Sequence, residues 1–262
     1  MSLCLSSVSS VPSVVNIFAT EDTEKIQIGT PAGHEVHVWK VSLDQSSRRT
    51  SRAIDILSPD ERQRACRFHF AKDRNQFIQS RAALRQLLAR YLRIAPGEVR
   101  FSYSEYGKPA LANGSAQNKL HFNLSRRDGL ALIAVAYDRE VGIDLELIRP
   151  DLPLMEIAES SFSSAEIAIL KSQPETTRTR SFYNCWTRKE AYLKARGEGL
   201  SFPLKQFDVS LAPGAPARLL EVRGDSAEVN CWMLREIPVN IKYVAALAIE
   251  CHPSVGSKTQ RV

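Results

Sequence analysis

Apolar and other residues alternate over residues 141–147, which read Val-Gly-Ile-Asp-Leu-Glu-Leu. Successive side chains of a β-strand point to opposite faces, so this period of two predicts a strand with its aliphatic side chains on one face. Asp144 and Glu146 then lie next to each other on the opposite face. Adjacent carboxylates repel each other, and a divalent cation between them would remove the repulsion. The alternative is an ordinary half-buried strand with acids on its wet face.

Glu190 and Lys194 add to this pattern from a predicted helix. A spacing of four residues puts both side chains on nearly the same helical face. Glu190 offers an anion to a metal ion, and Lys194 offers a cation to a phosphate. Because Mg²⁺ is commonly held by a few carboxylate oxygens together with substrate phosphates, these residues and the strand acids form a candidate site for metal-assisted phosphate chemistry.

Strands and helices are predicted along the whole chain. Residues 130–137 are apolar on both faces, which indicates a central strand of a sheet. Other strands are expected at 36–41, 99–103, 120–124, 207–211, 217–222, 231–236 and 244–249. Periodicity and capping signals predict helices beginning after Ser58, over 74–92, after Ser163, and over 182–196 up to Gly197. The mixture predicts an α/β (α+β) protein.

Two halves of similar make-up are expected, residues 34–140 and 141–252, because each combines helices with several strands. We detect no sequence repetition between them, so a duplicated architecture rests on the coarse order of elements. Residues 1–33 are rich in Ser and Thr and contain Gly-Thr-Pro-Ala-Gly, which predicts a variable N-terminal extension. Residues 253–262 are expected to form a tail.

The composition is that of a globular protein, with 262 residues of which 44% are hydrophobic and 24% charged. No stretch approaches the roughly 18 apolar residues of a membrane helix, and the N-terminus lacks a positively charged start. We therefore expect a cytoplasmic protein without a membrane partner. Five cysteines without a Cys-x-x-Cys pair, and five histidines without His-x-x-x-His spacing, disfavour a disulfide framework and a zinc site.

A basic block lies between residues 61 and 100, where ten Lys and Arg residues accompany three Asp and Glu residues. This excess accounts for the net charge of +6. It favours an anionic partner, which leaves a nucleotide cofactor, an acidic protein surface and nucleic acid open. The block carries no recognised nucleic-acid-binding motif, so no nucleic-acid partner is expected. For any single arginine, a solvated helix face is the ordinary alternative.

Residues 141–146 and 186–200 together resemble the two signatures of the 4′-phosphopantetheinyl transferases, in the larger surfactin-type group. The second segment spans 15 residues and has Trp186, Lys189-Glu190-Ala191, Lys194 and Gly197-Glu198-Gly199-Leu200 in register. Residues 101–109 and 121–125 agree with the same family. The resemblance covers residues 36–210 of this chain.

The resemblance implies a monomer of two similar, pseudo-twofold-related α/β subdomains, with coenzyme A bound in the cleft between them. Residues matching the family's magnesium ligands are Asp144, Glu146 and Glu190. Lys194 matches the lysine that contacts the coenzyme's phosphates, and Lys108 and Ser125 match other coenzyme contacts. Members of the family transfer the 4′-phosphopantetheine arm to a serine of an acyl or peptidyl carrier protein and release adenosine 3′,5′-bisphosphate.

One residue departs from the family pattern. A histidine usually follows Asn-Leu-Ser, and this chain has Arg126 there, followed by Arg127. We hypothesise that Arg126 takes over phosphate binding, because a guanidinium offers a permanent charge and a fork of donors.

The basic block has two expected roles in this family. Arg64, Lys72 and Arg74 are expected to reach the 3′-phosphate of coenzyme A. The remaining basic residues are expected to face an acidic carrier protein, where complementary charge speeds encounter, or to face solvent.

The implied chemistry leaves alternatives open. Glu190 can accept the serine proton directly or through a metal-bound water. Trp186 is expected to pack its helix into the core and so to orient Glu190 and Lys194. A magnesium-dependent phosphodiesterase with water as nucleophile, and an inactive coenzyme A-binding relative, are the alternative functions.

Overall fold

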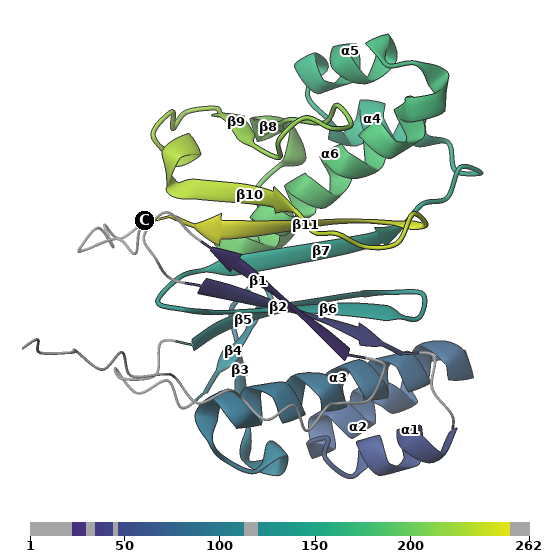
Figure 1. The fold of residues 1–262 in the computed structure, drawn as a ribbon, viewed down its shortest axis with the longest axis vertical. Helices are drawn as coiled ribbons and strands as arrows, with labels where there is room; N and C mark the ends of the chain where they lie inside the picture. The colour runs from purple at the N-terminus through teal and green to yellow at the C-terminus, as the bar shows by residue number, and fades with distance from the viewer. Residues whose placement is uncertain (1–22, 30–34, 44–46, 113–119, 252–262) are drawn as a thin grey trace, which may run out of the picture.

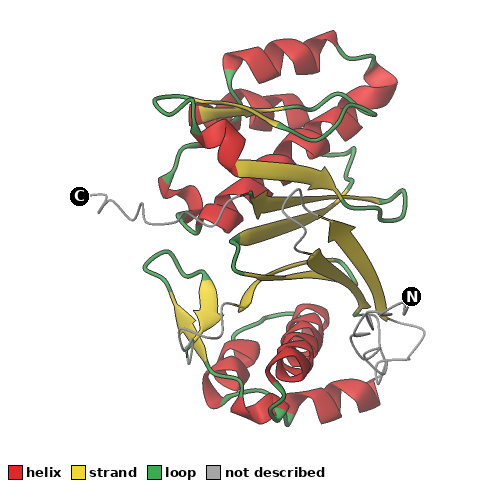
Figure 2. Cartoon of the chain, turned by 60° about the vertical axis from the view of Figure 1, so that its left-hand side comes forward, coloured by secondary structure: helices red, strands yellow, loops and turns green. Residues whose placement is uncertain are grey.

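The computed structural model describes residues 23–29, 35–43, 47–112 and 120–251. Its elements form four layers in the order helices, sheet, sheet, helices (Figure 1, Figure 2). The predicted α/β (α+β) class is confirmed. Residues 1–22 of the predicted extension and the predicted tail 253–262 lie outside the described residues.

The N-terminal half contains a four-stranded antiparallel sheet in the order β1-β2-β6-β5. Its strands are β1 (Thr23–Gly29), β2 (Glu35–Ser42), β5 (Leu120–Arg127) and β6 (Leu130–Tyr137). The outer face is covered by α1 (Ser47–Ile54), α2 (Pro59–Cys66) and α3 (Ala71–Leu92). After these helices come the 3-10 turn η1 (Pro96–Glu98) and the hairpin of β3 (Phe101–Tyr103) and β4 (Pro109–Leu111). The predicted central position of β6 is confirmed.

The C-terminal half contains a three-stranded antiparallel sheet in the order β10-β11-β7. Its strands are β7 (Val141–Leu147), β10 (Trp232–Glu236) and β11 (Tyr243–Glu250). The outer layer holds α4 (Leu154–Ser161), α5 (Ser164–Ser172) and the long helix α6 (Glu175–Arg196). Shorter pieces are η2 (Gly199–Ser201), η3 (Leu204–Gln206), β8 (Phe207–Val209), β9 (Leu219–Val222) and η4 (Glu228–Cys231).

Apolar cores separate the layers. Ile143 of β7 belongs to the core between the two sheets. Leu84 and Ile133 belong to the core between α3 and the first sheet, and Leu193 and Ala246 to the core between α6 and the second sheet. Since neighbouring side chains of β7 point to opposite faces, its aliphatic face lies against the other sheet and its acidic face lies against α6.

Two edge strands meet where the halves join. β5 ends the first sheet and β7 ends the second, and these strands lie side by side. Asn123 Oδ1 accepts a hydrogen bond from Ile143 N at 3.0 Å, and Ser125 Oγ accepts one from Leu145 N at 3.2 Å. Side chains of β5 thus satisfy the backbone donors that the edge of β7 would otherwise leave unpaired.

The predicted helix starts after Ser58 and Ser163 and the predicted end of α6 at Gly197 are confirmed. Ser58 N donates to Glu61 Oε2 at 3.0 Å, and Ser163 N donates to Glu166 Oε2 at 2.9 Å, as a capping box requires. Gly197 ends α6 with φ 76°, a left-handed conformation that suits glycine. α6 begins at Glu175, earlier than the sequence predicted, because its first two turns are polar and lack apolar periodicity.

The predicted start of the fold at residue 34 is wrong, because β1 lies within the expected N-terminal extension. β1 pairs along the whole of β2. Ile26 and Ile28 alternate along it and pack against the core between the sheets. Two apolar residues in a polar segment are a weak signal, as is common in an edge strand.

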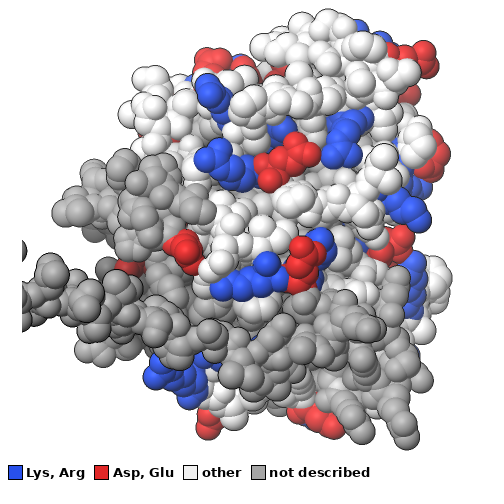
Figure 3. Space-filling view, in the orientation of Figure 1, with Lys and Arg blue, Asp and Glu red and all other residues white. Residues whose placement is uncertain are grey.

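Part of the basic block is structural. Glu61 is 2% exposed and accepts hydrogen bonds from Arg81 Nε at 2.7 Å and Arg85 Nε at 2.5 Å. Both guanidinium groups also lie over the ring of Phe101, at 4.6 and 5.2 Å. Arg85 is buried and the side chain of Arg81 is only 11% exposed, so both arginines serve the packing of this half. On the face drawn in Figure 3, described basic and acidic side chains are interspersed.

Candidate active site

Gly142 brings α6 and β7 into direct contact. A Cβ atom at this position would overlap the carbonyl oxygen of Ala191 and the backbone of Ala195. Only glycine allows the helix backbone to approach the strand so closely. The contact places the helix face that carries Glu190 and Lys194 beside the acidic face of β7.

Asp144 lies at the centre of the site and is 3% exposed. Its Oδ1 atom accepts hydrogen bonds from Lys194 Nζ at 2.5 Å and from Ser125 Oγ at 3.2 Å. Lys194 Nζ also lies 3.3 Å from Ser125 Oγ. The interpretation of the strand acids as part of a wet face is therefore wrong for Asp144, which is buried between β5, β7 and α6.

Two carboxylate groups of the site have oxygens that no described residue contacts by a hydrogen bond. Asp144 Oδ2 is buried and has no hydrogen-bond partner in the described part of the chain. Glu190 makes no hydrogen bond or ion pair with the residues that the structure describes. Burial, followed by the negative charge of Asp144, raises the pKa of Glu190, and the charge of Lys194 offsets this only in part. An unpartnered buried oxygen and a carboxylate of raised pKa both favour a cation beside them.

Glu146 is the third acid and pairs with Arg127. Arg127 Nε lies 2.8 Å from Glu146 Oε2, and the two side chains are 52% and 17% exposed. Burial and then the charge of Asp144 raise the pKa of Glu146 to about 7, against the opposing charges of Arg127 and Lys194. The negative charge of Glu190 also raises the pKa of Glu146, so the three acids influence one another electrostatically.

The oxygen-only donor set suits magnesium chemically, because Mg²⁺ prefers carboxylate oxygens. Within residues 23–29, 35–43, 47–112 and 120–251, however, no three His, Cys, Asp or Glu side chains are arranged as a ready metal-binding cluster. Lys194 forms an ion pair with Asp144, and Arg127 forms one with Glu146. The assignment of Asp144, Glu146 and Glu190 as metal ligands stays a prediction.

Lys108 lies near the C-terminal end of α6. Its Nζ atom donates to Glu140 Oε2 at 2.6 Å and to the carbonyl oxygen of Ala195 at 2.7 Å. Burial raises the pKa of Glu140, but a hydrogen bond from His121 and the charges of Lys108 and His121 outweigh it and lower the pKa to about 2. Lys108 therefore links the β3–β4 hairpin to α6, and its contact with the coenzyme stays a prediction.

The structure places Arg126 on the opposite face of β5 from Ser125. Its guanidinium lies over the rings of Phe68 and Phe77, 5.5 Å from each centroid. Arg64 lies over the Phe77 ring as well, at 5.6 Å. Burial and then the positive charge of Arg64 lower the pKa of Arg126, and Asp73 opposes them. Arg126 and Arg64 thus come together, whereas neither contacts Asp144.

The other predicted coenzyme contacts lie at the surface of the N-terminal half. Lys72 forms an ion pair with Asp128 in the turn between β5 and β6. Arg74 is exposed on α3. Trp186 is partly buried against the core of α6, where it stacks on Phe182 with ring centroids 6.0 Å apart, so its predicted packing role is confirmed.

Sequence reasoning missed two groups of residues around the site. No role is predicted for Arg127 from the sequence, although a period of two from Ser125 indicates that Arg127 lies on the same face of β5. Lys189, inside the second signature, is fully buried and pairs with Glu166 at 2.8 Å. Its Nζ atom also donates to the carbonyl oxygens of Leu204 and Phe207, at 2.7 and 2.5 Å. No local pattern distinguishes this buried lysine from a surface one.

Comparisons with known proteins show which family the chain matches. Residues 140–248 match the 4′-phosphopantetheinyl transferase superfamily model, and residues 39–138 match the model for the N-terminal part of 4′-phosphopantetheinyl transferases. The chain is 40% identical over 215 residues to the 4′-phosphopantetheinyl transferase HetI of Nostoc sp., covering 82% of this chain and 87% of the relative. Over 176 residues it is 31% identical to the transferase Sfp of Bacillus subtilis, covering 66% and 76%.

A more distant relative is the human L-aminoadipate-semialdehyde dehydrogenase-phosphopantetheinyl transferase, 28% identical over 210 residues that cover 75% of this chain and 68% of the relative. The chain belongs to the 4′-phosphopantetheinyl transferase superfamily and is an enzyme of that class. In the described part of the chain, no helix has the length and apolar character needed to cross a membrane.

Proposed function

We propose that this protein transfers the 4′-phosphopantetheine arm of coenzyme A to a serine of an apo acyl or peptidyl carrier protein. The reaction requires Mg²⁺ and releases adenosine 3′,5′-bisphosphate. The observation that carries the proposal is the placement of two acids, Glu146 and Glu190, and one ammonium group, that of Lys194, around Asp144, where β5, β7 and α6 meet. The membership of the family supports the same activity.

Asp144, Glu146 and Glu190 would hold the metal, and the unpartnered Oδ2 of Asp144 is the oxygen best prepared for it. A bound Mg²⁺ supplies positive charge to the diphosphate of coenzyme A as negative charge develops there. Lys194 adds a fixed ammonium group at the same place, and positioning of the reacting groups provides a further part of the rate.

Glu190 is the best candidate to accept the proton of the attacking serine. A serine hydroxyl is a poor nucleophile near neutral pH and must lose its proton during attack. Glu190 has no hydrogen-bond partner among the described residues, so its carboxylate is available to accept a proton. Burial raises the pKa of Glu190 in the metal-free protein, and a bound cation would oppose that rise. Glu190 can take this proton directly or through an intervening water.

Arg126 and Arg64 supply a second anion-binding region in this proposal. Two guanidinium groups over one aromatic ring repel each other, and an anion between them would relieve the repulsion. This arrangement supports phosphate binding by both residues. Lys72 and Arg74 lie on α3, next to the helix α2 that carries Arg64. The proposal therefore includes them as residues that bind the 3′-phosphate.

The test uses the full chain, coenzyme A, Mg²⁺ and a panel of apo carrier proteins. We expect one carrier at least to gain the mass of phosphopantetheine in intact-protein mass spectrometry. Glu190→Gln should abolish the gain, whereas Glu175→Gln makes the same change at an exposed position of α6 and should leave it intact. Release of adenosine 3′,5′-bisphosphate without any carrier would instead favour a phosphodiesterase.

A further inference from the structure

Arg127 is the last residue of β5 and lies on the strand face that looks toward β7. Alternation along the strand puts Asn123, Ser125 and Arg127 on this face and Arg126 on the other. The contacts agree, because Asn123 and Ser125 bind backbone donors of β7 and Arg127 binds Glu146. Of the two consecutive arginines, Arg127 is the one at the acidic site.

Each acidic side chain of β7 forms an ion pair with a different basic side chain. Lys194 Nζ lies 2.5 Å from Asp144 Oδ1, and Arg127 Nε lies 2.8 Å from Glu146 Oε2. Lys194 comes from α6, in the same half as both acids. Arg127 reaches across from the other half, so its ion pair with Glu146 spans the joint between the two sheets.

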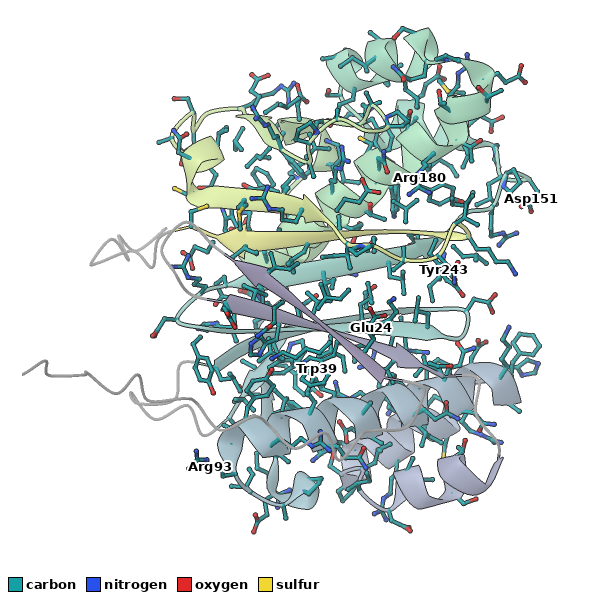
Figure 4. The ribbon with its side chains drawn as sticks, viewed as in Figure 1. Glu24, Trp39, Arg93, Asp151, Arg180 and Tyr243 are labelled. Carbon is teal, nitrogen blue, oxygen red and sulfur yellow. The ribbon has the colours of Figure 1, made fainter. Side chains whose placement is uncertain are left out.

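The backbone beside Arg127 is anchored, whereas its side chain is half exposed. Tyr243 Oη donates to the carbonyl oxygen of Asp128 at 2.7 Å, and Leu43 N donates to the carbonyl oxygen of Gly129 at 2.7 Å (Figure 4 labels Tyr243). Gly129 has φ 89°, as this tight turn requires. The guanidinium group can therefore leave Glu146 by rotation of the side chain while the strand stays in place.

A guanidinium group and a divalent cation compete for the carboxylate oxygens of Glu146. The arginine carries only hydrogen-bond donors, so a displaced guanidinium requires another acceptor. The proposed reaction brings phosphate oxygens to this place, and a planar fork of donors suits them well.

We propose that Arg127 is an internal counter-ion that competes with a divalent cation for Glu146 and, once displaced, binds a phosphate group of the substrate. This inference rests on the proposed function. Arg127 and Lys194 each place a positive charge beside one acid of β7. Displacement of Arg127 by a cation couples metal binding to phosphate binding, because each makes the other more favourable.

The test is isothermal titration calorimetry of the full chain with Mg²⁺ or Mn²⁺ alone, without coenzyme A. Arg127→Gln should bind the metal about fivefold more tightly than the unsubstituted protein, as expected for loss of a partly exposed competing charge. Arg127→Lys keeps the charge and should stay within about twofold. Arg180→Gln is the matched control, because Arg180 forms an exposed ion pair with Glu236 on another element (Figure 4).

Equal or weaker metal binding by Arg127→Gln would overturn the proposal, and so would a lack of metal binding by all four proteins. A second measurement compares coenzyme A affinity with and without Mg²⁺. The ratio of the two affinities should be smaller in Arg127→Gln than in the unsubstituted protein, and an unchanged ratio contradicts the coupling. Neither measurement depends on group transfer. Absence of carrier modification together with the expected metal affinities would therefore reject the proposed function and leave the counter-ion role standing.

Discussion

Ser125 and Lys194 come from opposite halves of the protein and bind the same carboxylate oxygen. Ser125 Oγ lies 3.2 Å and Lys194 Nζ 2.5 Å from Asp144 Oδ1. Ser125 Oγ also accepts the backbone N–H of Leu145. The geometry of the acidic site is therefore set by the same side chain that joins the two edge strands.

Ser125→Ala should destabilise the protein, because it leaves Leu145 N and Asp144 Oδ1 with one partner fewer. We expect the free energy of unfolding to fall by about 1–3 kcal/mol, the usual effect of leaving a buried polar group unsatisfied. Urea denaturation followed by circular dichroism measures this loss. Ser102→Ala, at an exposed position of β3, is the control and should stay within about 0.5 kcal/mol. Coincident unfolding curves for the two variants would contradict the bridging role.

Gly142→Ala should push α6 away from β7. The added methyl group would overlap backbone atoms of Ala191 and Ala195, which cannot move without moving the helix. We expect a loss of about 3 kcal/mol or more in unfolding free energy, with loss of group transfer. Gly97→Ala is the matched control, since no atom lies within 4 Å of its added Cβ. A Gly142→Ala protein as stable as the Gly97→Ala protein would show that the close approach is dispensable.

Much of this site could be predicted from sequence because it depends on local periodicity. The period of two along β7 indicates that Asp144 and Glu146 share a face, and the four-residue spacing on α6 pairs Glu190 with Lys194. Both predictions require only the geometry of one element. The structure adds what faces them: Lys194, expected beside a phosphate, lies 2.5 Å from Asp144 Oδ1.

The remaining features depend on tertiary arrangement or on the exact end of an element. The predicted strand 120–124 stops short of Arg127, so it does not indicate that Arg127 lies beside Glu146, whereas β5 extends to Arg127. The bond from Ile143 N to Asn123 joins two different sheets, and no local pattern indicates which edge strands meet. β1 escaped prediction because an edge strand needs few apolar residues.

Lys189→Met should destabilise the protein severely. Lys189 and Glu166 are 0% and 1% exposed and lie 2.8 Å apart, and the substitution leaves an uncompensated buried carboxylate. Breaking such a pair by removing one partner reduces the free energy of unfolding by about 3–5 kcal/mol. Lys171→Met is the control, because Lys171 and Glu159 are 57% and 55% exposed and their pair contributes about 0–1 kcal/mol. Thermal and urea unfolding of both variants measure the difference, and similar losses would mean that the buried pair is not a determinant of the fold.

Glu146 should make the metal-free protein less stable as the pH rises. Burial and the charge of Asp144 raise its pKa in the folded protein to about 7, from the ordinary value of 4.5. The folded state therefore binds more protons than the unfolded state between these values, and stability falls as the pH increases through this interval. Glu146→Gln lacks the titrating group, so it should exceed the unsubstituted protein by about 2–3 kcal/mol at pH 8 and match it near pH 4.5.

Urea denaturation in the presence of EDTA, repeated across this pH range, measures the predicted divergence. Glu156→Gln, at an exposed position of α4, is the control for removal of one negative charge and should follow the unsubstituted protein. Parallel curves for Glu146→Gln and the unsubstituted protein at every pH would mean that Glu146 titrates as an ordinary surface acid. Saturating Mg²⁺ should reduce the difference between the two proteins at pH 8 if the cation binds this carboxylate, because the charge that destabilises the folded state is then neutralised by its ligand.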